Sequence, residues 1–222
     1  MSTVTDSSTP TATPIRYLLF DLAGVLLNLD IEADTRALHS VGLPDFEQCQ
    51  KMPDLMRIVS LYLDGMIEAD AFLPMVRPYC SPTATDEQIL WSMDAVLGDI
   101  PVSRMQMLCR LRSQYKVYLL SNLNRKDWEY TKRLITNAGY SVEQLFDRTF
   151  ISYQMQLAKP DPRIYQEVIR ATGLNPAETL YMDDNSDNIR TGISLGFQCR
   201  QIKINHLEES FSENSVQLII DN

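Results

Sequence analysis

The 222-residue sequence has few of the residues that would link it to a polyanion. Lys and Arg number 20 against 29 Asp and Glu, so the formal net charge is −9, and no run of five or more basic residues occurs. Nucleic acids and anionic membranes attract clustered Lys and Arg. We therefore expect neither a nucleic acid nor a membrane as partner, and we expect a small molecule instead.

Cysteine is scarce, and long apolar runs are missing. The four cysteines are Cys49, Cys80, Cys109 and Cys199. Without a CxxC pair a thiolate metal site is not expected, and such scattered cysteines are typical of a reducing, cytoplasmic compartment. No apolar run reaches the ~18 residues of a membrane helix. The start, MSTVTDSSTPTATP, lacks the basic and apolar regions of a signal peptide, so we expect a disordered tail over residues 1–14.

The sequence contains several short apolar runs that end in polar residues. With 45% hydrophobic and 22% charged residues, the composition is that of a globular protein. The runs predict buried parallel strands at residues 16–21, 116–121, 148–152 and 179–184. Helical patterns between or after them cover residues 127–138, 162–172 and 186–195. This alternation predicts a doubly wound, Rossmann-like α/β sheet.

One stretch of the chain has a different pattern. Residues 32–98 have apolar positions at helical spacing, such as Leu55, Ile58, Val59 and Tyr62, and no convincing strand. We therefore expect a helical insertion there, with the α/β core formed by residues 15–31 and 99–222. The insertion holds eleven acidic and four basic residues, so it carries most of the net negative charge.

Reactive polar residues stand at the ends of three predicted strands. They are Asp21, Ser121 and the pair Asp183–Asp184, while Lys159 lies in a loop just before a helix. In open α/β sheets, ligands bind beyond the carboxyl ends of the strands, so these side chains are expected to meet at one edge. The pair Asp183–Asp184 has a further interpretation, as an N-terminal cap of the following helix.

Four segments carry a family resemblance. FDLAGVLLNLD, LLSNLN, AKPDPRIY and MDDNSDN resemble the four motifs of the haloacid dehalogenase-like hydrolases, over residues 15–204. LYLDGMIEADAF and the segment around DIPVSRMQMLCRLRSQYKVYLLSN resemble the phosphatase branch, near sugar-1-phosphate phosphatases and the N-terminal phosphatase domain of soluble epoxide hydrolases. The resemblance implies a C1-type helical cap over residues 32–98. It also implies a phosphatase acting on a small phosphorylated metabolite such as a sugar phosphate.

The resemblance also implies a metal and a nucleophile. Asp21 would attack phosphorus and form an aspartyl-phosphate. Asp21, Asp184 and the backbone carbonyl of Ala23 would hold a hard cation, for which Mg²⁺ is the natural candidate. Gly24 suits a tight turn beside the phosphate, where a side chain would intrude.

Further residues of the same motifs would serve the transferred phosphoryl group. Ser121 and the backbone N–H of Asn122 would donate hydrogen bonds to its oxygens, and Lys159 would pair with it and with Asp21. Asp183 and Asn188 would orient the metal-binding loop. Ser121, Asn122 and Lys159 are thus the expected substrate-binding residues.

The first motif departs from the family pattern at Ala23. The usual pattern has a second Asp there, which protonates the leaving oxygen and then activates water, a contribution typically worth ~10²–10⁴-fold. A leaving group of low pKa would need less protonation, or another group such as Asp183, Asp30 or His39 would substitute. The sequence leaves this choice open.

Three other functions compete with the phosphatase. A phosphonatase-like C–P hydrolase would use a cap lysine as a Schiff base, and Lys51 is the one lysine in the insertion. A catalytically impaired module that only binds a phosphometabolite would not need the nucleophile. Haloacid dehalogenation is disfavoured, because those enzymes do not keep an acidic pair such as Asp183–Asp184.

Overall fold

The computed structural model describes residues 13–210, so nearly all of the expected tail over residues 1–14 lies outside the described part. The chain forms a five-stranded, all-parallel sheet of order β3-β2-β1-β4-β5. Its strands are β1 (Tyr17–Phe20), β2 (Lys116–Ser121), β3 (Arg148–Ile151), β4 (Thr179–Asp183) and β5 (Gln198–Gln201). The predicted Rossmann-like α/β fold is confirmed. Only β5 was not predicted.

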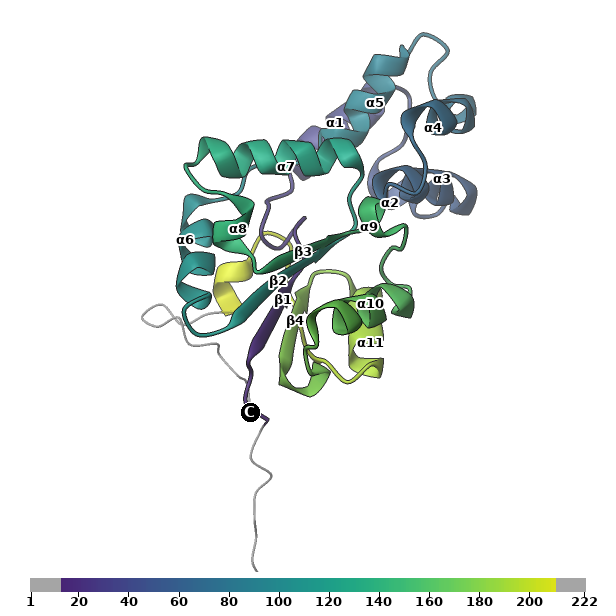
Figure 1. The fold of residues 1–222 in the computed structure, drawn as a ribbon. Coiled ribbons are helices and arrows are strands. Elements are labelled where there is room, and N and C mark those ends of the chain that lie inside the picture. The colour runs from purple at the N-terminus through teal and green to yellow at the C-terminus, as the bar shows by residue number, and fades with distance from the viewer. Residues whose placement is uncertain (1–12, 211–222) are drawn as a thin grey trace, which may run out of the picture.

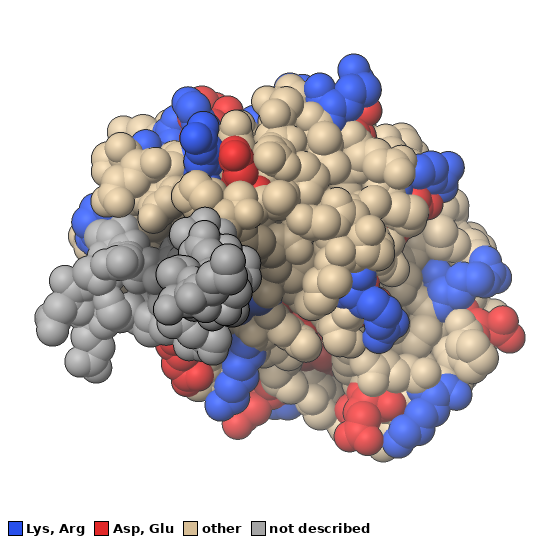
Figure 2. Space-filling model, turned by 90° about the horizontal axis from the view of Figure 1, so that it is seen from below, with Lys and Arg blue, Asp and Glu red and all other residues tan. Residues whose placement is uncertain are grey.

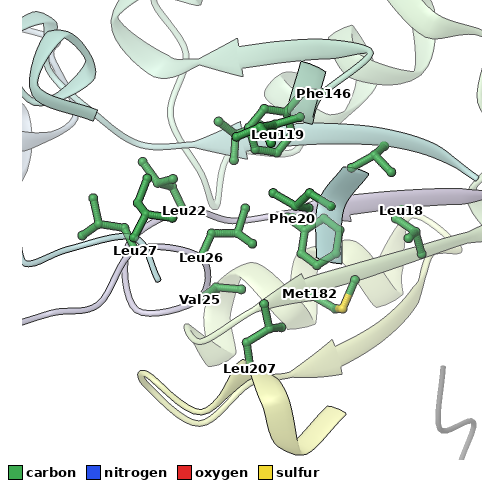
Figure 3. Close-up of a cluster of buried hydrophobic side chains, with 14 of the residues drawn as sticks. Leu18, Phe20, Leu22, Val25, Leu26, Leu27, Leu119, Phe146, Met182 and Leu207 are labelled. Carbon is green, nitrogen blue, oxygen red and sulfur yellow. The ribbon is translucent and has the colours of Figure 1, made fainter. Parts of the chain in front are cut away.

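Helices cover both faces of the sheet (Figure 1). One face carries α6 (Val102–Leu111), α7 (Arg125–Asn137) and α8 (Val142–Leu145), and the other carries α10 (Pro162–Thr172) and α11 (Ser186–Ser194). A short helix, α9 (Ser152–Met155), follows β3. Along β1, Leu18 and Phe20 pack on the first side and Leu19 on the second, as strand alternation requires. Figure 3 shows Leu18 and Phe20 among Leu119, Phe146 and Met182.

Local sequence explains where the helices begin. Pro162 opens α10, and Gly173 ends it in the left-handed conformation, as predicted. The side chain of Asn185 caps α11 by accepting from the N–H groups of Asp187 and Asn188. The interpretation of Asp183–Asp184 as the helix cap is therefore wrong, because the cap lies one residue later and leaves both acids free for other contacts.

Residues 31–94 form a separate group of helices, which we call the helical segment. Figure 1 shows its helices together at one end of the molecule, beyond the carboxyl ends of the strands. They are α1 (Ile31–Ser40), α2 (Phe46–Cys49), α3 (Pro53–Leu63), α4 (Ala69–Val76) and α5 (Asp86–Asp94). A hydrophobic cluster of their own includes the fully buried Leu55, Phe72 and Ile89. None of the helices within residues 13–210 has the length and apolarity that crossing a bilayer requires.

The chain enters and leaves the helical segment through two adjacent stretches. The Asn28 N–H donates to the Asp99 carbonyl (2.8 Å), the Gly98 N–H to the Asn28 carbonyl (2.9 Å) and the Asp30 N–H to the Val96 carbonyl (2.8 Å). A Cβ on Gly98 would lie 2.8 Å from the Asn28 oxygen, so glycine allows this close approach.

A buried arginine on α6 fastens the first of these stretches. The Arg104 guanidinium donates to the Leu26 carbonyl (3.2 Å), the Asn28 side chain (2.8 Å) and the Asn205 carbonyl (2.9 Å), and it pairs with Glu208 (2.7 Å). Arginine provides five donors in a fixed fork, which suits a site with several acceptors. Arg104 therefore joins the connection after β1 to the C-terminal part of the described chain.

Replacing Arg104 should destabilise the fold strongly. Arg104→Met leaves the four residues that accept from this guanidinium without their donor, and loss of one partner in a buried polar site costs about 3–5 kcal/mol. Arg110→Met, an exposed position on the same helix, should stay within about 0.5 kcal/mol of wild type. Urea unfolding of the two variants checks this, and equal midpoints would contradict the structural role of Arg104.

Candidate active site

The polar strand ends meet around the ammonium group of Lys159. Asp21 directly follows β1, and Asp183 is the last residue of β4. Lys159 Nζ lies 2.9 Å from Asp21 Oδ1 and 2.7 Å from Asp183 Oδ2. It also donates to the Leu120 carbonyl in β2 at 3.0 Å. All three charged residues are buried. Burial disfavours the lysine charge, but the two carboxylates outweigh it and raise the pKa of Lys159 above its ordinary value.

Asp183 is saturated with hydrogen-bond donors. Its carboxylate accepts from the Tyr181 hydroxyl (2.5 Å), the Asn188 side chain (3.0 Å) and the Asn185 N–H (2.8 Å), in addition to Lys159. Burial acts to raise the pKa of Asp183, but Lys159 and these donors outweigh it and hold the pKa below its usual value. A carboxylate held ionised in this way positions Lys159 and cannot readily give a proton.

Asp21 makes its contacts through a single oxygen. Oδ1 accepts from the Ser121 hydroxyl (2.8 Å) and the Leu22 N–H (2.6 Å) and pairs with Lys159. The other oxygen, Oδ2, takes part in none of these contacts, although Asp21 lines the cavity described below. Burial raises the pKa of Asp21 to about 6, against the opposing effect of Lys159.

Asp184 lies beside the turn that follows β1. A Cβ on Gly24, whose φ is +78°, would be 3.0 Å from Asp184 Oδ2, so glycine is needed both for the backbone conformation and for space. Burial and then the negative charges of Asp21 and Asp183 raise the pKa of Asp184 to about 7. Among the described residues, no Lys, Arg or His forms an ion pair with this carboxyl group of the kind that Lys159 forms with Asp183.

The aspartates form an oxygen cluster that fits a hard cation. Carboxylate oxygens of Asp21, Asp183 and Asp184 all lie within 4.8 Å of one another. Because Lys159 and other donors occupy Asp183, the oxygens left for a metal belong to Asp21 and Asp184. Mg²⁺ uses one or two carboxylates in such sites. A cation there would offset the repulsion that raises the pKa of Asp184.

The remaining predicted residues lie around this cluster. The Asn122 side chain forms two 2.9 Å hydrogen bonds to the backbone of Lys159, one to its N–H and one to its carbonyl, and so fixes that loop. Ala23 follows Asp21 by two residues and lines the same cavity. No acid therefore stands at this position.

A cavity of about 720 Å³ runs from this cluster toward the helical segment. Two acids that line it, Asp64 and Asp127, were not predicted. Burial raises the pKa of Asp64 to about 6 and, together with the neighbouring Asp94, that of Asp127 to about 7. The Ser152 hydroxyl donates to the Asp64 carbonyl at 2.6 Å and holds the end of α3 against the core. The Asp-Gly pair in LYLDGMI was the only signal for Asp64.

Three predicted candidates lie away from the cavity. Asp30 caps α1 by accepting from the Ala33 N–H at 2.8 Å, and His39 is exposed on the same helix. Lys51 is exposed and pairs with Glu47 at 3.3 Å. None of the three lines the cavity. With Asp183 committed to Lys159, neither the substitute acids suggested by the sequence nor a Schiff-base lysine is placed for chemistry at Asp21.

Known proteins share this architecture. The chain is 28% identical over 189 residues to D-ribitol-5-phosphate phosphatase of Bacteroides thetaiotaomicron, covering 84% of this chain and 91% of the relative. A solved structure of a HAD family enzyme from that organism, in complex with magnesium and inorganic phosphate, superposes with a TM-score of 0.73 at 32% identity, covering 86% and 96% of the two chains. A sesquiterpene phosphatase of Aspergillus oryzae is 29% identical over 98 residues, covering 43% and 47%.

A family model extends the match over most of the chain. It describes the haloacid dehalogenase-like hydrolases and matches residues 15–196, which include β1 to β4 and every side chain of the aspartate–lysine cluster. This family assignment agrees with the similarity to the relatives above and with the parallel α/β sheet of the structure. The chain therefore belongs to the haloacid dehalogenase-like hydrolases.

Proposed function

We propose that the protein is a Mg²⁺-dependent phosphatase that hydrolyses a small phosphorylated metabolite through an aspartyl-phosphate at Asp21. The observation that carries this proposal is the asymmetry of the Asp21 carboxylate. Three donors hold Oδ1, which orients Oδ2 as the attacking atom. Two of the relatives named above are phosphatases, one named for a ribitol phosphate and one for sesquiterpenes. Their names support a shared reaction on substrates that differ in the leaving group.

The reaction divides into two transfers. In the first, an O–P bond forms to Asp21 Oδ2 as the ester P–O bond breaks, and the alcohol leaves with a proton that comes finally from water. In the second, water attacks phosphorus, and inorganic phosphate and the Asp21 carboxylate are released. Lys159 and the Ser121 hydroxyl offer donors to the phosphoryl oxygens. Mg²⁺ held by Asp21, Asp184 and the Ala23 carbonyl would neutralise charge on the transferring group.

The competing functions find less support. A C–P hydrolase needs a lysine near the reacting carbon, and Lys51 lies outside the cavity. A dehalogenase needs no metal, whereas Asp184 stands next to Asp21 and forms no ion pair with a Lys, Arg or His within residues 13–210. A module that only binds phosphate has no use for a nucleophile oriented as Asp21 is.

We further propose that residues 32–98 act as a C1-type cap. The helical segment supplies much of the cavity wall, so it would exclude bulk water and select the leaving alcohol.

All four cysteines are free, which suits a cytoplasmic protein. On the face seen in Figure 2, Lys and Arg lie scattered, many of them beside Asp or Glu, which favours a small substrate over a nucleic acid or a membrane.

Asp21→Asn should abolish turnover and leave the fold intact. The amide cannot form the acyl phosphate, while its oxygen can still accept from Ser121 and Leu22. Phosphate release and far-ultraviolet circular dichroism measure the two effects, and Glu129→Gln, an exposed acid on α7, is the control for turnover. Substantial activity in folded Asp21→Asn would refute the covalent scheme.

Asp184→Asn should remove the response to Mg²⁺. A ligand that binds only the folded state raises its stability with concentration, so millimolar Mg²⁺ should raise the melting temperature of wild type and have little effect on the variant. Asp187→Asn, an exposed acid on α11, should respond as wild type does. An unchanged Mg²⁺ response in Asp184→Asn would place the metal elsewhere.

Ala23→Asp should change the rate with poor leaving groups more than the rate with good ones. The introduced carboxyl would stand where the family has its general acid, and protonation matters most for an alkoxide of high pKa. Rates with an alkyl and an aryl phosphate measure the difference. Equal effects on both esters would mean that position 23 does not face the leaving oxygen.

A further inference from the structure

The cavity beyond the phosphate-binding end is mainly apolar. Its wall in the helical segment includes buried and partly buried side chains from α1, the loop after it, α3 and α5. These are Leu38, Leu43, Met56, Val59, Leu63 and Met93. The same segment also lines the cavity with polar side chains such as Thr35, Gln50 and Ser92. Hydroxyl groups of a polyol that faced the six apolar side chains would lose water without gaining a hydrogen-bond partner from them, which is unfavourable.

Exposed apolar side chains also gather along this cavity. Ile31 (52% exposed), Phe46 (46%) and Ile204 (43%) are among the few large hydrophobic residues on the described surface, and all three line it. Grouped exposed apolar residues mark a binding region more often than single ones do. Ile31 and Phe46 come from the helical segment and Ile204 from the core, so both parts of the chain contribute apolar surface.

The charges of the lining exclude a second anion. Among the described residues that line the cavity, Lys159 is the only Lys, Arg or His, and it is already paired with Asp21 and Asp183. Away from the phosphate-binding end the charged residues that line the cavity are acids of the helical segment, such as Asp34 and Asp45. A carboxylate or second phosphate on the leaving group would meet like charges with no compensating cation.

The size of the cavity fits a sizeable leaving group. About 720 Å³ falls within the range of ~300–1,000 Å³ typical of sites for drug-sized ligands. A phosphate and a five-carbon polyol would leave much of this apolar wall uncovered, whereas an alkyl chain would cover it.

We infer that this cavity binds the leaving alcohol of the substrate, and that this alcohol is uncharged, mainly aliphatic and larger than a five-carbon polyol. The inference rests on the proposed phosphatase activity and names the substrate class of that same site. The phosphate group of the ester is held by the core, and the hydrocarbon part is covered by the helical segment.

A homologous series of esters tests the inference. With Mg²⁺ present, kcat/KM should rise from ethyl through butyl and hexyl to octyl phosphate, by up to about fourfold for each methylene that is fully buried. Octyl phosphate should exceed D-ribitol 5-phosphate, and 1,8-octanediol bisphosphate should fall well below octyl phosphate. A flat series, or ribitol 5-phosphate as the better substrate, would overturn the inference.

A matched pair of variants localises the effect. Met56→Gln keeps the length of the side chain and adds polarity to the cavity wall, so the octyl-to-ethyl ratio of kcat/KM should fall. Met52→Gln makes the same substitution just before α3, at a methionine that does not line the cavity. This control should keep the wild-type ratio. An unchanged ratio in a folded Met56→Gln variant would argue that the alkyl chain binds elsewhere.

An aryl ester separates the two proposals. If p-nitrophenyl phosphate is hydrolysed but the alkyl series is flat, the phosphatase proposal stands and the substrate class is wrong. If no ester is hydrolysed with Mg²⁺, the phosphatase proposal fails, and the substrate class fails with it.

Discussion

The site depends on one buried ammonium group between two carboxylates. Lys159 comes from the loop before α10, Asp21 from the end of β1 and Asp183 from the end of β4, so the triad fixes three parts of the chain relative to one another. Buried charges are tolerated only when they are paired and hydrogen-bonded. Asn122 adds a second constraint by binding the Lys159 backbone on both sides. The carboxylate of Asp21, the proposed nucleophile, is thereby oriented before any substrate arrives, which would lower the entropic cost of catalysis.

Environment gives three neighbouring aspartates three different properties. Asp183 meets Lys159, Tyr181 and Asn188 and stays ionised, so its contribution is to hold the lysine. Asp21 is held at one oxygen and has the other for chemistry. Asp184 faces the narrow turn at Gly24 and has mostly negative neighbours, which is the situation that a divalent cation relieves. Under the proposed function, the same residue type would thus serve as a positioning group, a nucleophile and a metal ligand because of what each one touches.

The sequence predicted the cluster of polar side chains at the strand ends far better than the part of the cavity that the helical segment lines. Apolar strands that end in Asp21, Ser121 and Asp183 form a local pattern, and parallel topology brings such ends together without further information. Strand β5 was missed because its residues, QCRQ, are polar and partly exposed at a sheet edge. Asp64 and Asp127 reach the cavity only through the packing of the helical segment on the core. No local pattern encodes that packing. The sequence therefore offered Asp30 and His39 as substitute acids without a position for either, and neither lines the cavity.

The uneven charge of the chain acquires a physical meaning in this arrangement. A protein that binds phosphate esters would be expected to attract anions, yet the helical segment is strongly acidic. The conflict disappears if the cavity attracts the phosphoryl group at one end and repels other negative groups of a ligand along the rest of its wall. Lys159 and a bound cation would receive one phosphoryl group at the core end of the cavity, while acids of the helical segment such as Asp34 and Asp45 would disfavour a second negative charge elsewhere in it. With apolar side chains lining the same cavity, an uncharged carbon chain would be the ligand that loses least free energy on entering. Selectivity would then come as much from what the cavity repels as from what it binds.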